Sequence, residues 1–194
     1  MIYSKKYTTL TRDELKEKVS QHMSDKRFQH VLRVEKKALE LAKRYDVDLE
    51  KASIAALTHD YAKERPDEEM IGLIKSEGFD LDLINYGNAI WHGIVGSFLV
   101  KTELGINDED ILTAIELHTT GACEMSELAK VIYVADYVEE GRQFPVVVKA
   151  REIANDNLDL AVSFETKHTL LYLINQQSRI YPKTLETYNQ WVAQ

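Results

Sequence analysis

Glycine and proline are scarce in this chain, and their scarcity constrains its fold more than any other feature. The 194 residues include 8 glycines and 3 prolines. Both residues disfavour the interior of a helix, proline by about 3 kcal/mol relative to alanine. Alternating polar and apolar residues, which are typical of half-buried strands, are also rare. We therefore predict an all-α fold built from long helices.

Helix-type spacing of apolar residues and capping signals place the individual helices. Thr11 with Glu14 predicts the start of a first helix through a capping box, and a second is expected to start near Ser24 or Asp25. The remaining helices are expected over 49–62, 66–77, 87–104, 107–118, 126–140, 146–154, 158–180 and 183–193. Three consecutive valines make 146–154 suitable for a strand as well. No repeat or flexible linker divides the chain, so we predict one domain over 1–194, with a helical core at 20–184 and flanking terminal helices.

Composition and charge exclude several classes of protein. Hydrophobic residues make up 44% of the chain, which is enough for a buried core. The net charge of -8 argues against nucleic acid and anionic membranes as partners, but a few local cations can still hold a small anionic substrate. Cys123 is the only cysteine, and neither a secretory signal nor a run of about 18 apolar residues is visible. We expect a cytoplasmic protein with no membrane partner, and its oligomeric state is left open, with a homodimer as one option.

Polar residues interrupt the apolar helical patterns at several points. A single such residue is most simply explained as a buried group satisfied by a hydrogen bond. Six of them are less easily explained in this way, because they lie on or near the ends of several different predicted helices. They are His30, His59, Asp60, His92, His118 and Asp136. Helical bundles build metal sites from side chains on facing helices, and this mixture of imidazole and carboxylate suits iron, manganese, zinc or magnesium. The number of ligands is too large for one zinc with an open position, so we predict two metals with Asp60 as the bridge.

Three cationic residues accompany these polar residues. Arg27 lies one helical turn before His30, Lys63 lies one turn after His59, and Arg142 follows Asp136. Any one of them is most simply a solvated surface residue. Together, in an acidic protein, they predict a local phosphate site, and the combination of metals with cations is typical of phosphoryl transfer.

The order of these residues resembles a known family. His30, the pair His59–Asp60 and Asp136 match the H…HD…D signature of the HD-domain metal-dependent phosphohydrolases. Five longer segments resemble the YqeK-type branch of that superfamily: RFQHVLRV (27–34), HDYAK (59–63), WHG (91–93), HTTG (118–121) and ADYVEEGRQF (135–144). The resemblance extends from about residue 20 to 184. It implies a helical bundle with its metal site between the helices.

The resemblance also implies an activity and its cofactors. Members of that branch are symmetrical bis(5'-nucleosyl)-tetraphosphatases, which cut diadenosine tetraphosphate into two ADP molecules at a di-iron centre. By this carry-over, the first metal is held by His30, His59, Asp60 and Asp136. The second metal is held by His92 and His118, with Asp60 bridging. Iron is expected, and manganese or another divalent metal is the alternative.

Substrate-binding residues are carried over in the same way. Asp60 and Lys63 are expected to act in catalysis, and the expected substrate-binding residues are Arg27, Lys63, Thr119, Arg142, Phe144, Pro145, Arg179, Tyr181 and Thr184. Glu140–Gly141 stands where the family pattern ADxxEPxR has its proline, which affects the expected shape of that turn. His22 and His168 lie beside no matched motif and are predicted to be structural or surface residues.

Other functions are compatible with the same residues. One alternative is another HD-superfamily enzyme: a nucleotidase, a phosphodiesterase or a guanosine-tetraphosphate hydrolase. A second is a nucleotide-binding regulator whose metal site senses nucleotides without cutting them. A third is a helical scaffold with a satisfied polar core, in which removal of metal would change nothing.

Overall fold

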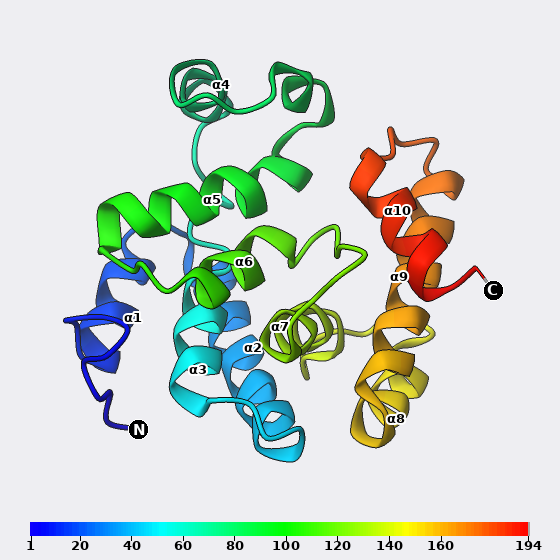
Figure 1. The fold of residues 1–194 in the computed structure, drawn as a ribbon, viewed down its shortest axis with the longest axis horizontal. Coiled ribbons are helices and arrows are strands. Elements are labelled where there is room, and N and C mark those ends of the chain that lie inside the picture. Colours follow the sequence, from blue (N-terminus) through cyan, green and yellow to red (C-terminus); the bar gives the residue numbers. More distant parts are fainter. Residues whose placement is uncertain (194) are drawn as a thin grey trace.

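The chain folds as an assembly of helices (Figure 1). The computed structural model describes residues 1–193, and the regular elements within them are ten α-helices and one 3-10 helix, with no β-strand. They are α1 (Arg12–Ser20), α2 (Asp25–Arg44), α3 (Leu49–Thr58), α4 (Asp67–Ser76), η1 (Leu81–Tyr86), α5 (Asn88–Leu104), α6 (Glu109–Leu117), α7 (Glu127–Val138), α8 (Val147–Asp156), α9 (Leu158–Asn175) and α10 (Pro182–Trp191). The predicted all-α fold is confirmed. No helix in this part of the chain is both long and apolar enough to cross a membrane.

Local capping explains where several helices begin and end. The Thr11 side chain accepts a hydrogen bond from the Glu14 backbone N–H, and the Glu14 carboxylate accepts one in return from the Thr11 N–H, as the predicted capping box requires. The Ser24 hydroxyl caps α2 by accepting from the backbone N–H of Arg27. α5 ends at Gly105, whose φ of 66° lies in the left-handed region.

The largest differences from the predicted elements are one added element and two helices that end early. The helix expected over 158–180 ends at Asn175. The helix expected over 146–154 is confirmed as α8 (Val147–Asp156), so the alternative of a strand is wrong. The 3-10 helix η1 was not predicted. The helix expected over 49–62 ends at Thr58, where the Thr58 hydroxyl donates to the carbonyl of Ile54 (2.8 Å) and His59 Nδ1 lies 2.7 Å from the Ala56 carbonyl. In a longer helix the Ala56 carbonyl would accept from the N–H of Asp60, so the His59 ring competes for it, and the chain turns at residues 59–62.

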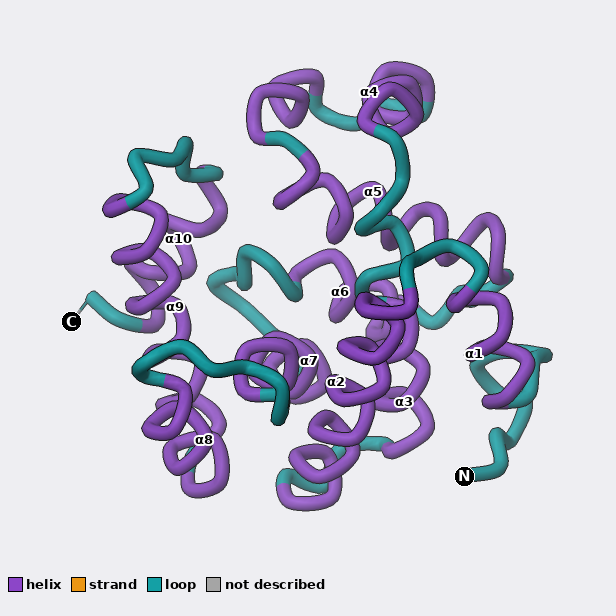
Figure 2. Tube along the Cα trace, turned by 180° about the vertical axis from the view of Figure 1, so that it is seen from behind, coloured by secondary structure: helices purple, strands orange, loops and turns teal. Residues whose placement is uncertain are grey.

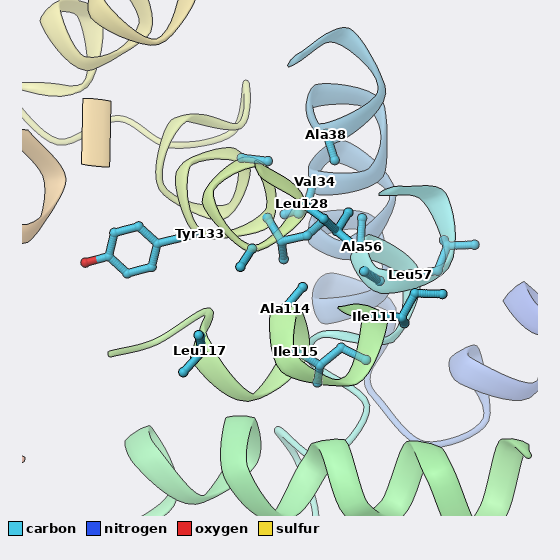
Figure 3. Close-up of a cluster of buried hydrophobic side chains, with 14 of the residues drawn as sticks. Val34, Ala38, Ala56, Leu57, Ile111, Ala114, Ile115, Leu117, Leu128 and Tyr133 are labelled. Atoms are coloured by element: carbon cyan, nitrogen blue, oxygen red, sulfur yellow. The ribbon is translucent and has the colours of Figure 1, made fainter. Parts of the chain in front are cut away.

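One part of the core lies among four helices that also carry much of the polar cluster. Figure 3 shows its apolar side chains, which come from α2, α3, α6 and α7: Val34, Ala38, Ala56, Leu57, Ile111, Ala114, Ile115, Leu117, Leu128 and Tyr133. Full burial of one large apolar side chain contributes about 1.5–3 kcal/mol. Because packing fixes these four helices, it also fixes the polar residues that lie on them or directly follow them.

Helix α5 lies against α6 (Figure 1). Gly93 sets how closely the two helices approach. A Cβ atom at position 93 would lie 2.9 Å from the Glu116 carbonyl oxygen and 3.4 Å from that of Ile115. Backbone atoms cannot move away as a flexible side chain can. The glycine therefore allows the contact that brings His92 on α5 close to His118 at the end of α6.

We expect Gly93→Ala to lower the free energy of unfolding by about 1–3 kcal/mol, because the added methyl group forces the two helices apart. Gly72→Ala on α4 is the matched control, since a Cβ there meets nothing within 4 Å. Alanine is favoured over glycine in a helix by about 1 kcal/mol, so this control is expected to be stabilising. Urea unfolding measures both changes, and equal shifts for the two variants would contradict the proposed close contact.

The C-terminal helices form a wall beside the core. α9 lies against α7, α8 and α10, away from α1 at the other end of the molecule (Figure 1). Seen from behind, the loop that joins α7 to α8 runs between these helices (Figure 2). This arrangement places α9 opposite the polar cluster.

Candidate metal centre and substrate cavity

The six polar residues that interrupt the helical pattern come together in space. Their ligand atoms form three overlapping groups, and within each group all of these atoms lie within 4.8 Å of one another. The groups are His30–His59–Asp60, His59–His118–Asp136 and Asp60–His92–His118. Segments up to about 100 residues apart in the chain supply them, so their convergence is a property of the fold.

Asp60 lies at the centre of the cluster, with each carboxylate oxygen facing a different pair of histidines. Its Oδ2 is 3.4 Å from His59 Nε2 and 3.6 Å from His30 Nε2. Its Oδ1 is 3.4 Å from His92 Nε2 and 3.9 Å from His118 Nε2. This geometry is what a carboxylate bridging two metal ions would need.

Hydrogen bonds at Nδ1, the ring nitrogen that points away from Asp60, orient the four histidines. Nδ1 of His59, His92 and His118 lies 2.6–2.7 Å from a backbone carbonyl oxygen about one turn earlier in the chain. Nδ1 of His30 lies 3.2 Å from a carboxylate oxygen of Glu139. Because each of these acceptors requires a proton on Nδ1, the neutral ring presents an unprotonated Nε2 to the cluster.

The Nε2 atoms show that the cluster suits metal ions. Those of His30 and His59 are buried and have no hydrogen-bond partner among residues 1–193. Those of His92 and His118 lie 3.0 Å apart, so two lone pairs face one another. An unsatisfied buried acceptor costs about 1–3 kcal/mol, and divalent cations bound in the cluster would satisfy all four. Imidazole and carboxylate together suit iron, manganese, zinc or magnesium.

The protonation states also suit metal binding. Burial would raise the pKa of Asp60, but the surrounding histidines hold it well below its ordinary value. Burial would likewise raise the pKa of Asp136, and His30 together with Arg142 holds it well below that value. Burial lowers the pKa of His118 to about 4. The carboxylates are therefore ionised and His118 is neutral near pH 7, which are the forms that bind metals.

The three predicted cationic residues lie at the edge of the cluster. Arg27 Nη1 is 2.9 Å from Asp60 Oδ2, and Arg142 Nη2 is 2.5 Å from Asp136 Oδ1. Lys63 Nζ lies 3.4 Å from the ring nitrogens of His92. In the turn before Arg142, where the family pattern has a proline, the Gly141 N–H donates to the Glu139 carboxylate at 2.5 Å.

The cluster opens into a cavity of about 700 Å³. Ten predicted site residues line it: Arg27, Asp60, Lys63, His92, His118, Thr119, Asp136, Arg142, Phe144 and Pro145. The rings of Tyr137 and Phe144 pack with centroids 4.7 Å apart and give the cavity an aromatic side. The site therefore combines a metal-ligand cluster, three cations and an apolar surface.

A sequence profile of the HD domain matches residues 27–141, more than half of the chain. The chain belongs to the HD domain family. Three similar proteins extend this finding. The "Bis(5'-nucleosyl)-tetraphosphatase, symmetrical" of Bacillus subtilis (strain 168) is 42% identical over 95% of this chain and 99% of that protein. The protein with the same description from Halalkalibacterium halodurans is 44% identical over 89% of this chain and 92% of that protein.

A solved structure from Clostridium acetobutylicum, described as a "predicted HD superfamily hydrolase involved in NAD metabolism", matches with a TM-score of 0.89 and 38% identity. The match covers 94% of this chain and 97% of that one. The family resemblance read from the sequence is therefore confirmed. The matched HD domain ends at residue 141, so α8–α10, including the α9 wall of the cavity, lie outside it.

Three residues expected in the substrate site are not brought to this cavity. Arg179, Tyr181 and Thr184 are absent from its lining. Arg179 is exposed on the loop before α10, and Thr184 is buried near the start of α10. The ring of Tyr181 packs against that of Tyr86 on η1, with centroids 4.9 Å apart. A role of this segment in wrapping the nucleotide stays a prediction.

Helix α9 supplies cavity residues that the sequence interpretation missed. Glu165, His168, Thr169 and Tyr172 all line the cavity. Their spacing of three and four residues places them on one face of the helix. His168 was predicted to be a structural or surface residue, and the structure places it in the cavity lining. His22 is different, because its ring packs against Tyr61 at a centroid distance of 4.8 Å, away from the cavity lining.

Glu165 is the most unusual of these residues. It is 6% exposed, and its Oε2 has no hydrogen-bond partner within the described chain. Burial, followed by the negative charge of Asp136, raises the pKa of Glu165 well above its ordinary value. The side chain is therefore a neutral carboxylic acid that faces the cavity.

We expect Glu165→Gln to stabilise the metal-free protein more at pH 8 than at pH 5. Glutamate in the unfolded chain ionises at about pH 4.5, whereas the folded protein holds Glu165 neutral. The folded state then binds the extra proton, so the stability of the wild type falls as the pH rises toward the folded pKa. Glutamine has no proton to lose. Thermal unfolding of chelated protein at both pH values measures the difference, with Glu124→Gln, on the exposed surface, as the control for one lost charge.

Proposed function

We propose that this protein is a metal-dependent hydrolase that cleaves diadenosine tetraphosphate symmetrically into two ADP molecules. The observation that carries the proposal is the position of Asp60 between two pairs of histidines, at the end of a cavity with three cations. Two relatives that are 42% and 44% identical, and that match most of the chain, are described as symmetrical bis(5'-nucleosyl)-tetraphosphatases. The cytoplasmic location and the homodimer considered from the sequence stay predictions.

The proposed cofactors are two divalent metal ions, with iron as the first choice and manganese as the alternative. One ion would be held by His30, His59, Asp60 and Asp136. The other would be held by His92, His118 and the second oxygen of Asp60. Bound divalent ions supply Lewis acidity, which makes water a nucleophile near neutral pH.

The protein side chains supply charge and orientation. Arg27, Lys63 and Arg142 surround the cluster and would offset negative charge on the phosphoryl oxygens and on the departing ADP. Tyr137 and Phe144 would hold the adenine of one half by stacking. This contact would set which phosphorus atom lies at the metals and hence which phosphoanhydride bond of the tetraphosphate is cleaved.

A product assay tests the proposal. Metal-loaded protein is incubated with diadenosine tetraphosphate and the nucleotides are separated, with His59→Ala as the control. ADP as the sole product, lost in the variant, is the expected result. AMP and ATP as products would show asymmetrical cleavage and would overturn the proposed position of the cut. No product with iron or manganese present would overturn the proposed substrate and favour another phosphate ester or a nucleotide sensor.

A further inference from the structure

A second hollow lies next to the substrate cavity, on the other side of two arginines. Its volume is about 420 Å³. The residues that line it are Ser24, Lys26, Arg27, His30, Arg33, Glu64, Glu139, Gly141 and Arg142. Arg27 and Arg142 also line the substrate cavity, so they form a shared boundary. We call this second space the polar hollow.

The two spaces differ in chemistry. The substrate cavity has an apolar side that includes Tyr137, Phe144 and Tyr172. The polar hollow has no apolar side chain in its lining and carries four cationic residues against two carboxylates. This local excess of positive charge occurs in a chain whose net charge is -8. Its surface therefore suits phosphate groups, and no phenyl, phenol or indole ring lines it for a base to stack on.

The two carboxylates of the polar hollow already have partners within the fold. Glu139 accepts from Arg33 Nε at 2.7 Å, and Glu64 accepts from the Ser24 backbone N–H at 2.5 Å and from its hydroxyl at 2.9 Å. Lys26 is exposed, and its ammonium forms no salt bridge with any described residue. Lys26 is thus available to an anion that enters the hollow.

The shared arginines connect the polar hollow to the reaction centre. Arg27 pairs with Asp60, and Arg142 pairs with Asp136. Both carboxylates belong to the candidate metal cluster. Metal ions bound there would neutralise them and free the guanidinium groups to bind phosphate oxygens on either side.

We propose that the polar hollow holds the second half of a dinucleoside tetraphosphate through its phosphates alone, without recognition of its base. This inference rests on the proposed function. The phosphate chain crosses the boundary between Arg27 and Arg142, one base lies in the substrate cavity, and the other half extends past Lys26. The enzyme then recognises the base of one nucleoside of its substrate and accepts any nucleoside at the other end.

Steady-state kinetics on three substrates test this asymmetry: diadenosine, mixed adenosine–uridine and diuridine tetraphosphate. We expect kcat/KM for the mixed substrate to be about half that for diadenosine tetraphosphate, because only one of its two orientations is productive. Diuridine tetraphosphate is expected to be about tenfold worse or more, because it lacks the purine that stacks best. If the enzyme recognised both bases equally, each uridine would lower kcat/KM by the same factor. The logarithm of kcat/KM for the mixed substrate would then lie midway between those for diadenosine and diuridine tetraphosphate. That result, or equal rates for all three substrates, would overturn the inference.

A pair of charge reversals on the same helix tests the role of Lys26. Lys26→Glu and Lys43→Glu change the net charge equally, and both lysines are exposed on α2, but only Lys26 lines the polar hollow. We expect Lys26→Glu to raise KM for diadenosine tetraphosphate about fivefold above Lys43→Glu, and the difference to shrink at high salt. Equal KM values would overturn the inference. Failure of the wild type to form ADP would instead overturn the proposed function itself, so the two failures are distinguishable.

Discussion

Asp60→Asn is expected to lower kcat for diadenosine tetraphosphate by at least about 10³-fold and to lower the metal content of the purified protein. The carboxylate faces two histidines with each oxygen, and an amide can offer only one oxygen to a metal. Its NH₂ group would point at two Nε2 atoms and occupy them as a hydrogen-bond donor. Product analysis gives the rate, and elemental analysis gives the metal content per chain.

Asp13→Asn is the matched control, because Asp13 is exposed in the first turn of α1, where its only salt bridge within the described residues is a 3.9 Å pair with Arg12. It is expected to keep both rate and metal. If Asp60→Asn also kept them, Asp60 could not be a bridging ligand. If it lost activity but kept two metals per chain, the cluster would hold its metals without this carboxylate.

The helices could be predicted from the sequence because their signals are local. Thr11 and Glu14 cap α1 through each other, and Gly105 ends α5 through its own backbone conformation. The end of α3 was missed for the opposite reason. The hydrogen bond of His59 competes with the helix only once the surrounding core has fixed its side chain, and the apolar pattern continues to residue 62.

The metal-ligand cluster could be predicted from the sequence, whereas the α9 side of the cavity could not. The histidines and aspartates were identified because charged or polar residues are unusual in apolar helices, whatever the tertiary structure. The face of α9 with Glu165 and His168 has helical spacing too, but the sequence does not say which helix face turns toward the site. Glu139 lay within a recognised motif, yet its contact with His30 spans 109 positions and could not be predicted from the motif.

Lys63→Met is expected to lower kcat by about 10²- to 10³-fold while leaving the metal content unchanged. Lys63 is predicted both to act in catalysis and to bind substrate. It lines the cavity and is not one of the candidate metal ligands. Its ammonium forms no salt bridge with the carboxylates of residues 1–193 and lies 3.4 Å from both ring nitrogens of His92. Burial lowers the pKa of Lys63 from its ordinary value. As an ammonium, the side chain would offset charge that develops on the phosphoryl oxygens.

The substitution to methionine keeps the length and apolar stem of the side chain and removes only the charge. Lys63→Arg restores the charge with a wider head group, so we expect it to recover part of the lost rate. Lys75→Met, at the exposed end of α4, is the control for the loss of one positive charge elsewhere on the surface. Loss of metal together with the rate would show that Lys63 acts by supporting His92. Loss of the rate alone, partly restored by arginine, would assign Lys63 to the phosphate chain, because a merely structural lysine would not distinguish arginine from methionine in kcat at constant metal content.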